Sequence, residues 1–135
     1  MTTDTLKKAV AKSQETGYLF IATADRGGLP HIAAGGPLTL LPDKKQVAFE
    51  TWFCPRTVAN VSINRWMSLA IWNPSQDDGY QLLGWVEEVQ DILLLDGFSP
   101  EMEKKGPVPP AKKRLTLRVD KVIGFHRSAH TDEPL

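Results

Sequence analysis

The chain has 135 residues, 41% of them hydrophobic, a size that supports one domain with one core and is too short for two ordinary domains. Sixteen Lys and Arg residues balance 16 Asp and Glu residues, and this zero net charge argues against a general nucleic-acid-binding protein, which needs a basic surface. The single cysteine, Cys54, excludes an intramolecular disulfide and a cysteine-rich metal cage.

The N-terminal segment, residues 1–16, predicts a helix that is amphipathic over residues 4–16. Thr3 or Asp4 can cap its start, Gly17 can end it, and lysines fill one face. The other face carries apolar and small side chains at helical spacing, namely Leu6, Ala9, Val10 and Ser13. No apolar run follows a basic region, and no stretch approaches the roughly 20 apolar residues that cross a bilayer. We therefore expect a cytoplasmic protein without membrane contact.

The middle of the chain predicts β-strands separated by turns. Runs of β-formers, several alternating with polar residues, predict strands at residues 18–24, 29–34, 46–51, 66–72, 80–90 and 115–119. Gly35-Gly36-Pro37 breaks the second strand before extended structure resumes at 38–41, and Gly84 indicates a bulge or a close approach of backbones. These about six strands show no strand–helix–strand alternation, which favours an antiparallel barrel over a doubly wound sheet.

Three segments outside these strands are less regular. Residues 56–64 predict a short helix that begins near Pro55. Residues 91–105 fit either a strand or a helix, and they lead into a rigid extended linker at 106–110. The tail at 127–135 is polar, and we expect it to be loose.

The start of the short helix carries Arg56 and Thr57, the pair with the most informative chemistry. The first N–H groups of a helix lack internal partners and the helix dipole favours negative charge there, so a phosphate can be held well. The Arg56 guanidinium can grip a phosphate with two parallel bonds, and the Thr57 hydroxyl can add another. The alternative is that Thr57 only caps the helix and that Arg56 is solvated.

Two further features could accompany a planar ligand. Gly35 and Gly36 break a strand, which lets a flat molecule approach the backbone, although an ordinary bulge would explain them too. Trp52 lies in the loop before the proposed phosphate site, where its ring could flank such a molecule. The other tryptophans lie within strands, where core or interface roles are commoner, and they are Trp66, Trp72 and Trp85.

Several segments, taken in order, resemble the FMN-binding split-barrel family, which includes pyridoxamine 5′-phosphate oxidases and small bacterial FMN-binding proteins. The resembling segments are Ala22-Thr23-Ala24 with Gly28 and Pro30-His31 (first hairpin), residues 55–61 with 67–69 (phosphate segment and next strand), residues 80–87 (central strand) and residues 114–122 (last strand). Their order and spacing agree over roughly residues 15–125. The resemblance implies a mainly β fold, a six-stranded antiparallel Greek-key split barrel with short helices.

The resemblance also implies a cofactor and a set of cofactor-binding residues. FMN would place its phosphate on Arg56 and Thr57 and its ring along the backbone of residues 33–36 and near residues 50–52. The candidate residues are therefore Ala33, Ala34, Gly35, Gly36, Glu50, Thr51, Trp52, Arg56, Thr57 and Asn60. A homodimer with the flavin at the subunit interface is implied as well, because a barrel this small has little room inside.

The expected function is that of an FMN-dependent oxidoreductase with an unknown substrate and an unknown electron donor. The residues that bind pyridoxal phosphate in the true oxidases are not recognisable, so we do not expect a vitamin B6 oxidase. The family often has a helix before its last strand, and the matching region here is short and ends in residues 106–110. We expect no metal site and no catalytic role for Cys54. The alternatives are an electron carrier or flavin store, a haem-binding relative that uses His126 or His130, and an unrelated oligonucleotide-binding barrel, which the neutral charge disfavours.

Overall fold

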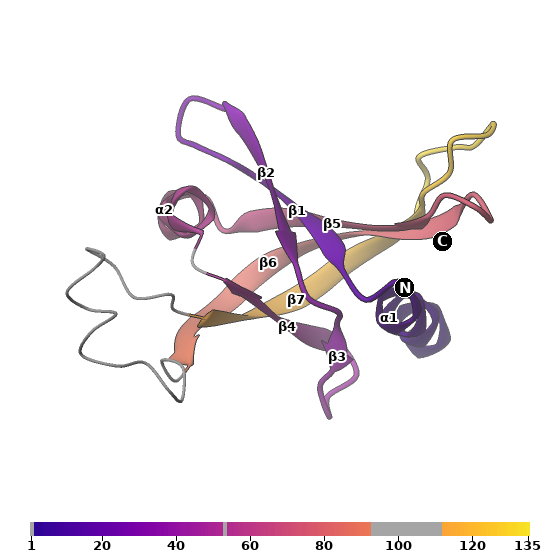
Figure 1. Ribbon diagram of the computed structural model, residues 1–135, viewed down its shortest axis with the longest axis horizontal. Coiled ribbons are helices and arrows are strands. Elements are labelled where there is room, and N and C mark those ends of the chain that lie inside the picture. Colours follow the sequence, from indigo (N-terminus) through magenta and orange to yellow (C-terminus); the bar gives the residue numbers. More distant parts are fainter. Residues whose placement is uncertain (1, 53, 93–111) are drawn as a thin grey trace, which may run out of the picture.

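The computed structural model describes residues 2–52, 54–92 and 112–135, which form a single antiparallel sheet wrapped into a barrel with two helices beside it (Figure 1). Seven strands follow one another in the sheet in the order β2-β1-β5-β6-β7-β4-β3. The elements are α1 (Thr3–Thr16), β1 (Leu19–Ala24), β2 (Pro30–Gly35), β3 (Thr39–Leu40), β4 (Gln46–Trp52), α2 (Pro55–Ile63), β5 (Trp66–Asn73), β6 (Asp78–Ile92) and β7 (Lys112–Gly124). The predicted mainly β, antiparallel barrel with short helices is confirmed, whereas the irregular segment predicted at 91–110 lies almost entirely outside the described residues.

The strand count is seven rather than six because one predicted strand is interrupted. β2 pairs with β1 at one side of the sheet, and β3 pairs with β4 at the other. The chain between them turns from one partner to the other, and the Gly36 N–H donates to the Glu50 carbonyl at 2.8 Å. This interrupted segment therefore brings the two edges of the sheet together and closes the barrel.

Gly35 and Gly36 are glycines for reasons of space. A Cβ on Gly35 would lie 3.1 Å from Ile21 Cδ1 and 3.4 Å from Phe49 Cδ2 inside the barrel. A Cβ on Gly36 would lie 3.2 Å from the Glu50 carbonyl oxygen that its own N–H approaches. The two glycines thus permit the close approach of β2 to β4, which is a structural role that their sequence position alone does not reveal.

The core lies inside the barrel and under α1. Alternate residues of the strands point inward, and the largest fully buried side chains include Phe49, Ile21, Leu69, Leu82 and Leu117. The predicted inward face of α1 is confirmed, because Leu6, Ala9, Val10 and Ser13 are all buried. The helix is capped by Thr2, one residue before the predicted cap, and ends at Gly17 with a φ of 86°.

β6 and β7 are joined along most of their length with two register shifts. One shift lies between Leu83 and Gly84, so the bulge predicted at Gly84 is confirmed. A Cβ on Gly84 would lie 2.4 Å from the Arg118 carbonyl oxygen, so the close approach of backbones holds there too. This long ribbon carries the first residues of β7 to one end of the barrel and the tail to the other (Figure 1).

The tail beyond β7, which we expect to be loose, is held at both of its ends. Asp77, at the turn before β6, accepts hydrogen bonds from the backbone N–H groups of Arg127 (2.6 Å) and Ser128 (2.9 Å) and from Trp72 Nε1 (3.1 Å). The last residue, Leu135, donates its N–H to the Val122 carbonyl at 2.8 Å. The side chains between these anchors are exposed.

Candidate functional site

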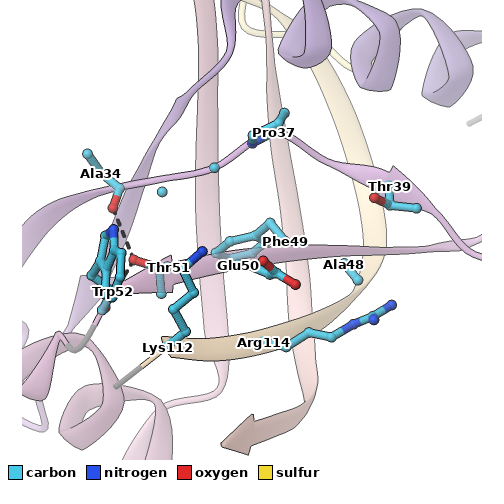
Figure 2. Close-up of a pocket in the computed structure, with 12 residues that line it drawn as sticks. Ala34, Pro37, Thr39, Ala48, Phe49, Glu50, Thr51, Trp52, Lys112 and Arg114 are labelled. Carbon is cyan, nitrogen blue, oxygen red and sulfur yellow. Dashed lines mark hydrogen bonds between the residues drawn. The ribbon is translucent and has the colours of Figure 1, made fainter. Parts of the chain in front are cut away.

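A cleft of about 690 Å³ runs along β4 (Figure 2). The end of β2, the residues between β2 and β3, and the beginning of β7 complete its walls. It is lined by Ala34, Gly35, Gly36, Pro37, Thr39, Ala48, Phe49, Glu50, Thr51, Trp52, Lys112 and Arg114. Because side chains alternate along a strand, Glu50 and Trp52 are exposed while Phe49 and Thr51 are buried.

The cleft gathers more than half of the residues predicted to bind a cofactor. Six of them line it, namely Ala34, Gly35, Gly36, Glu50, Thr51 and Trp52. Ala33 is the neighbour of Ala34 in β2 but packs against the core. The three predicted residues of α2, which are Arg56, Thr57 and Asn60, do not line the cleft and lie beyond its Trp52 end.

Two predicted residues have structural contacts of their own. The Thr51 hydroxyl donates to the Ala34 carbonyl at 3.1 Å, which ties β4 to β2 across the cleft (Figure 2). Asn60 is 3% exposed, and its Nδ2 donates to the Thr23 hydroxyl at 3.0 Å, which ties α2 to β1. A cofactor-binding role for these two side chains stays a prediction.

The first turn of α2 contains a buried polar group that has no hydrogen-bond partner among the described residues. The N-cap residue is Cys54, and its side chain makes no capping hydrogen bond. Thr57 is fully buried, and its hydroxyl has no hydrogen-bond partner among the described residues. The capping role considered for Thr57 is therefore absent from this structure, while Arg56 beside it is exposed.

Cys54 itself has the properties of a poorly reactive thiol. Burial raises its pKa. The Thr51 and Thr57 hydroxyls face the thiol, although neither meets normal hydrogen-bond geometry with it, and they offset the effect of burial only in part. A raised pKa favours the protonated thiol, which is the weaker nucleophile. This environment supports the expectation that Cys54 is not catalytic.

Six residues of the cleft are not among those predicted from the sequence to bind a cofactor, and they are Pro37, Thr39, Ala48, Phe49, Lys112 and Arg114. Lys112 and Arg114 line the cleft because β7 pairs with β4. In this pairing Lys112 lies opposite Trp52, and Arg114 lies opposite Glu50. Lys112 Nζ lies 4.9 Å from the centroid of the Trp52 ring. The run of three cations, Lys112, Lys113 and Arg114, is visible in the sequence, but the pairing that brings two of them to this cleft is not.

An uncharged and largely apolar face adjoins the cleft on the outside of β2, β1, β5 and β6. Residues directly opposite one another on paired strands share a face, which gives the rows Ile32–Ala22–Ser68–Leu83, Ala34–Phe20–Ala70–Gln81 and Trp66–Trp85. Ile32 is 68% exposed, Trp66 51% and Phe20 45%. Ala34 belongs to both this face and the cleft, so the two are continuous.

Two kinds of site are not found in the part of the chain that the structure describes. No group of three or more His, Cys, Asp or Glu side chains is placed to hold a metal ion within residues 2–52, 54–92 and 112–135. Neither helix of those residues is long and apolar enough to cross a membrane.

The cleft lies within a stretch of the chain that matches a known protein family. The model of the pyridoxamine 5′-phosphate oxidase family matches residues 5–126. The chain belongs to this family. No curated protein matches it in sequence.

Solved structures of the family share the fold. A Clostridium acetobutylicum protein related to general stress protein 26 has a TM-score of 0.66 at 16% identity, covering 100% of this chain and 97% of its own. An FMN-binding protein from Syntrophomonas wolfei has a TM-score of 0.64 at 18% identity, with 90% and 86% covered. A pyridoxamine 5′-phosphate oxidase-related, FMN-binding protein from Nostoc punctiforme has a TM-score of 0.61 at 14% identity, with 93% and 84% covered.

Proposed function

We propose that the protein binds FMN, with the flavin ring in the cleft beside residues 33–36 and 50–52 and the phosphate at the first turn of α2. The observation that carries this proposal is the buried Thr57 hydroxyl, which has no partner among the described residues. An unsatisfied buried hydroxyl costs about 1–3 kcal/mol, so such a group in a native protein calls for an explanation. A phosphate oxygen would accept its hydrogen bond, and the Arg56 guanidinium is adjacent in sequence.

The cleft suits a flavin in size and in lining. Its volume of about 690 Å³ falls in the range of pockets that hold cofactors. Trp52, 51% exposed, offers an aromatic edge or face beside the ring, and the backbone of Gly35 and Gly36 offers polar groups without side chains in the way. When bound, FMN would supply the redox chemistry, and the protein would position it and exclude water.

We further propose that two copies of the chain pair through the uncharged face of β2, β1, β5 and β6. An exposed apolar surface of this extent marks an interaction site, and a second copy is the occupant because the face runs into the cleft at Ala34. A partner seated there would cover the open side of the flavin.

The dimer has a direct test. Ile32→Arg places a charge on the β2 side of the face, at a side chain that is 68% exposed, and should convert a dimer into a monomer in light scattering, with weaker FMN binding. Arg26→Ala in the exposed hairpin turn is the control and should remain a dimer. A wild-type chain that is monomeric with flavin bound would exclude this interface.

The function that this site supports best is that of an FMN-dependent oxidoreductase, with an electron carrier or flavin store as the alternative. Rapid reduction of bound flavin by a nicotinamide, a deazaflavin or a reduced protein would favour the enzyme. Tight FMN binding without turnover of any of these donors would favour the carrier.

Haem is the alternative ligand, and the two histidines that could hold it lie at the other end of β7 from the cleft. His126 and His130 follow the end of β7, and the 13 residues of that strand span about 40 Å at the usual rise per residue. His126 Nδ1 already lies 2.7 Å from the Asp77 carbonyl oxygen. Titration of the apo-protein with haem should therefore give no sharp Soret change that depends on either histidine.

The test of FMN binding compares two ligands and two variants. FMN and riboflavin differ only in the phosphate, so Arg56→Ala should weaken FMN binding by about 1–3 kcal/mol and leave riboflavin binding unchanged. Flavin fluorescence titration measures both, with Arg26→Ala as the matched control. Equal affinities of the Arg56→Ala variant and the wild type for FMN would contradict the phosphate assignment.

A further inference from the structure

Some of the cationic side chains of β7 form ion pairs with carboxylates of the described residues, and others do not. Lys113 forms an ion pair with Asp91, and further along the strand Arg118 Nε lies 2.6 Å from Glu87 Oε1. Lys112 and Arg114 line the cleft, and no carboxylate of the described residues lies within 4.0 Å of either cationic group. We propose that Lys112 and Arg114 form an anion-binding subsite of the cleft, which takes a phosphate or carboxylate group.

The strand geometry fixes both side chains toward the cleft. Lys112 and Arg114 are two residues apart, so they leave β7 on the same side. Their partners across the ladder, Trp52 and Glu50, are exposed on the same face (Figure 2). The contact of Lys112 Nζ with the Trp52 ring, 4.9 Å from its centroid, holds the ammonium group over the cleft.

The charge of the cleft favours an anion. Glu50, Lys112 and Arg114 are the charged residues that line it, which leaves one net positive charge. Glu50 lies opposite Arg114 in the ladder yet forms no ion pair with it among the described contacts, so the guanidinium keeps its donors for a ligand. Arg binds a planar carboxylate or a phosphate through two parallel bonds, and Lys adds a point charge.

Two sources of such an anionic group fit, and both rest on the proposed FMN function. One is the phosphate of FMN itself, bound at β7 instead of at α2. The other is an anionic group on the molecule that exchanges electrons with the flavin. The two sources predict different responses to riboflavin, which lacks the phosphate.

The experiment uses the full chain and the double variant Lys112→Ala/Arg114→Ala. Lys113→Ala is the control for position, because it removes one positive charge from the residue between them, which does not line the cleft. Circular dichroism checks that each variant is folded. Flavin fluorescence gives the affinities for FMN and riboflavin, and calorimetric titration of the FMN-loaded protein gives the affinity for inorganic phosphate and for oxalate.

Two outcomes support the subsite. A loss of about 10- to 100-fold in FMN affinity with unchanged riboflavin affinity assigns it to the FMN phosphate, and Arg56→Ala should then leave FMN affinity unchanged, which would exclude the phosphate site at α2. Unchanged flavin affinities with loss of phosphate or oxalate binding assign it to the anion of a second ligand. In either case Lys113→Ala behaves as the wild type, and Glu50→Gln strengthens anion binding because it removes the opposing carboxylate.

Other outcomes overturn it and remain distinct from a failure of the FMN proposal. If the folded double variant matches the wild type in every titration, or if Lys113→Ala loses as much, the subsite does not exist. If the wild type binds neither flavin, the FMN proposal fails. Titration of the unloaded protein with inorganic pyrophosphate then tests whether the Lys112 and Arg114 subsite exists. If the wild type binds pyrophosphate and the double variant does not, the subsite is supported. If the wild type does not bind pyrophosphate, the subsite is overturned.

Discussion

The polar groups near the two ends of β7 differ in whether they have hydrogen-bond or ion-pair partners. At the tail end, the Asp77 carboxylate accepts three hydrogen bonds, from Trp72 Nε1 and from two backbone N–H groups of the tail. At the cleft end, the Thr57 hydroxyl has no partner and two cations of β7 lack an ion pair, as far as the described residues go. Polar groups with hydrogen-bond partners stabilise a fold, whereas buried polar groups without a partner are destabilising unless a ligand supplies one. The contrast therefore assigns structure to one end of the molecule and binding to the other.

The largest expected effect is on stability at the tail end. A Cβ added at Gly79 would lie 2.0 Å from the Ile71 carbonyl oxygen and 2.9 Å from Trp72 Cα, and backbone atoms in a ladder do not yield. Gly79→Ala should lower the free energy of unfolding by about 3 kcal/mol or more, measured by urea denaturation.

A control for that substitution lies in the hairpin turn. A Cβ on Gly27 would meet Asp25 Oδ1 at 3.5 Å, an ordinary contact, so Gly27→Ala should change the free energy of unfolding by less than about 0.5 kcal/mol. If Gly79→Ala is as stable as Gly27→Ala, the ladder between β5 and β6 is not packed as the structure has it.

The next effect tests the cleft end, where stability and binding should move in opposite directions. Thr57→Val replaces an unpartnered buried hydroxyl by a methyl group of similar size, so the unloaded protein should keep its stability or gain up to about 1 kcal/mol. FMN affinity should fall about fivefold, because one hydrogen bond to the phosphate is lost. Urea denaturation without flavin and fluorescence titration with FMN give the two values.

Thr51→Val sharpens this test because its hydroxyl is partnered. It donates to the Ala34 carbonyl at 3.1 Å, so its removal should cost about 0.5–1.5 kcal/mol of stability. If Thr57→Val destabilises the protein as Thr51→Val does, the Thr57 hydroxyl has a protein partner after all, and the proposed phosphate site loses its main support.

Local patterns predicted much of this structure because they act within one element. The buried face of α1 follows from helical spacing, and Gly17, left-handed with a φ of 86°, ends that helix as expected. The exposure of Glu50 follows from strand alternation, whereas Trp52, which we expect in a loop, is the last residue of β4. These signals predicted the antiparallel barrel, whereas most of the predicted residues of the cleft came from the family resemblance.

What the sequence did not predict depends on pairing between distant segments. Lys112 reaches the cleft only because β7 pairs with β4, about sixty residues earlier in the chain. Asn60 is turned inward by the Thr23 hydroxyl of β1, a contact that a helix start with a phosphate-binding pattern does not reveal. The tail, polar throughout, gives no sign that Asp77 holds it.

The smallest effect is the pH dependence of the tail anchor. Hydrogen bonds from the Arg127 and Ser128 backbones hold the pKa of Asp77 well below its usual value of 3.8. A lowered pKa in the folded state stabilises the fold above the unfolded value, and this contribution is lost as the pH falls below about 4. Asp77→Asn should therefore be less stable than the wild type near neutral pH, and the difference should shrink between about pH 4 and pH 2.

Thermal unfolding followed by circular dichroism measures this difference, and Asp120→Asn, an exposed residue of β7, is the control of equal charge change. FMN affinity should be the same in the wild type and in Asp77→Asn, because the anchor and the cleft lie at opposite ends of the strand. A fall in FMN affinity in Asp77→Asn that matches the fall in Thr57→Val would show that the two ends are coupled. The division of the barrel into a structural end and a binding end would then have to be abandoned.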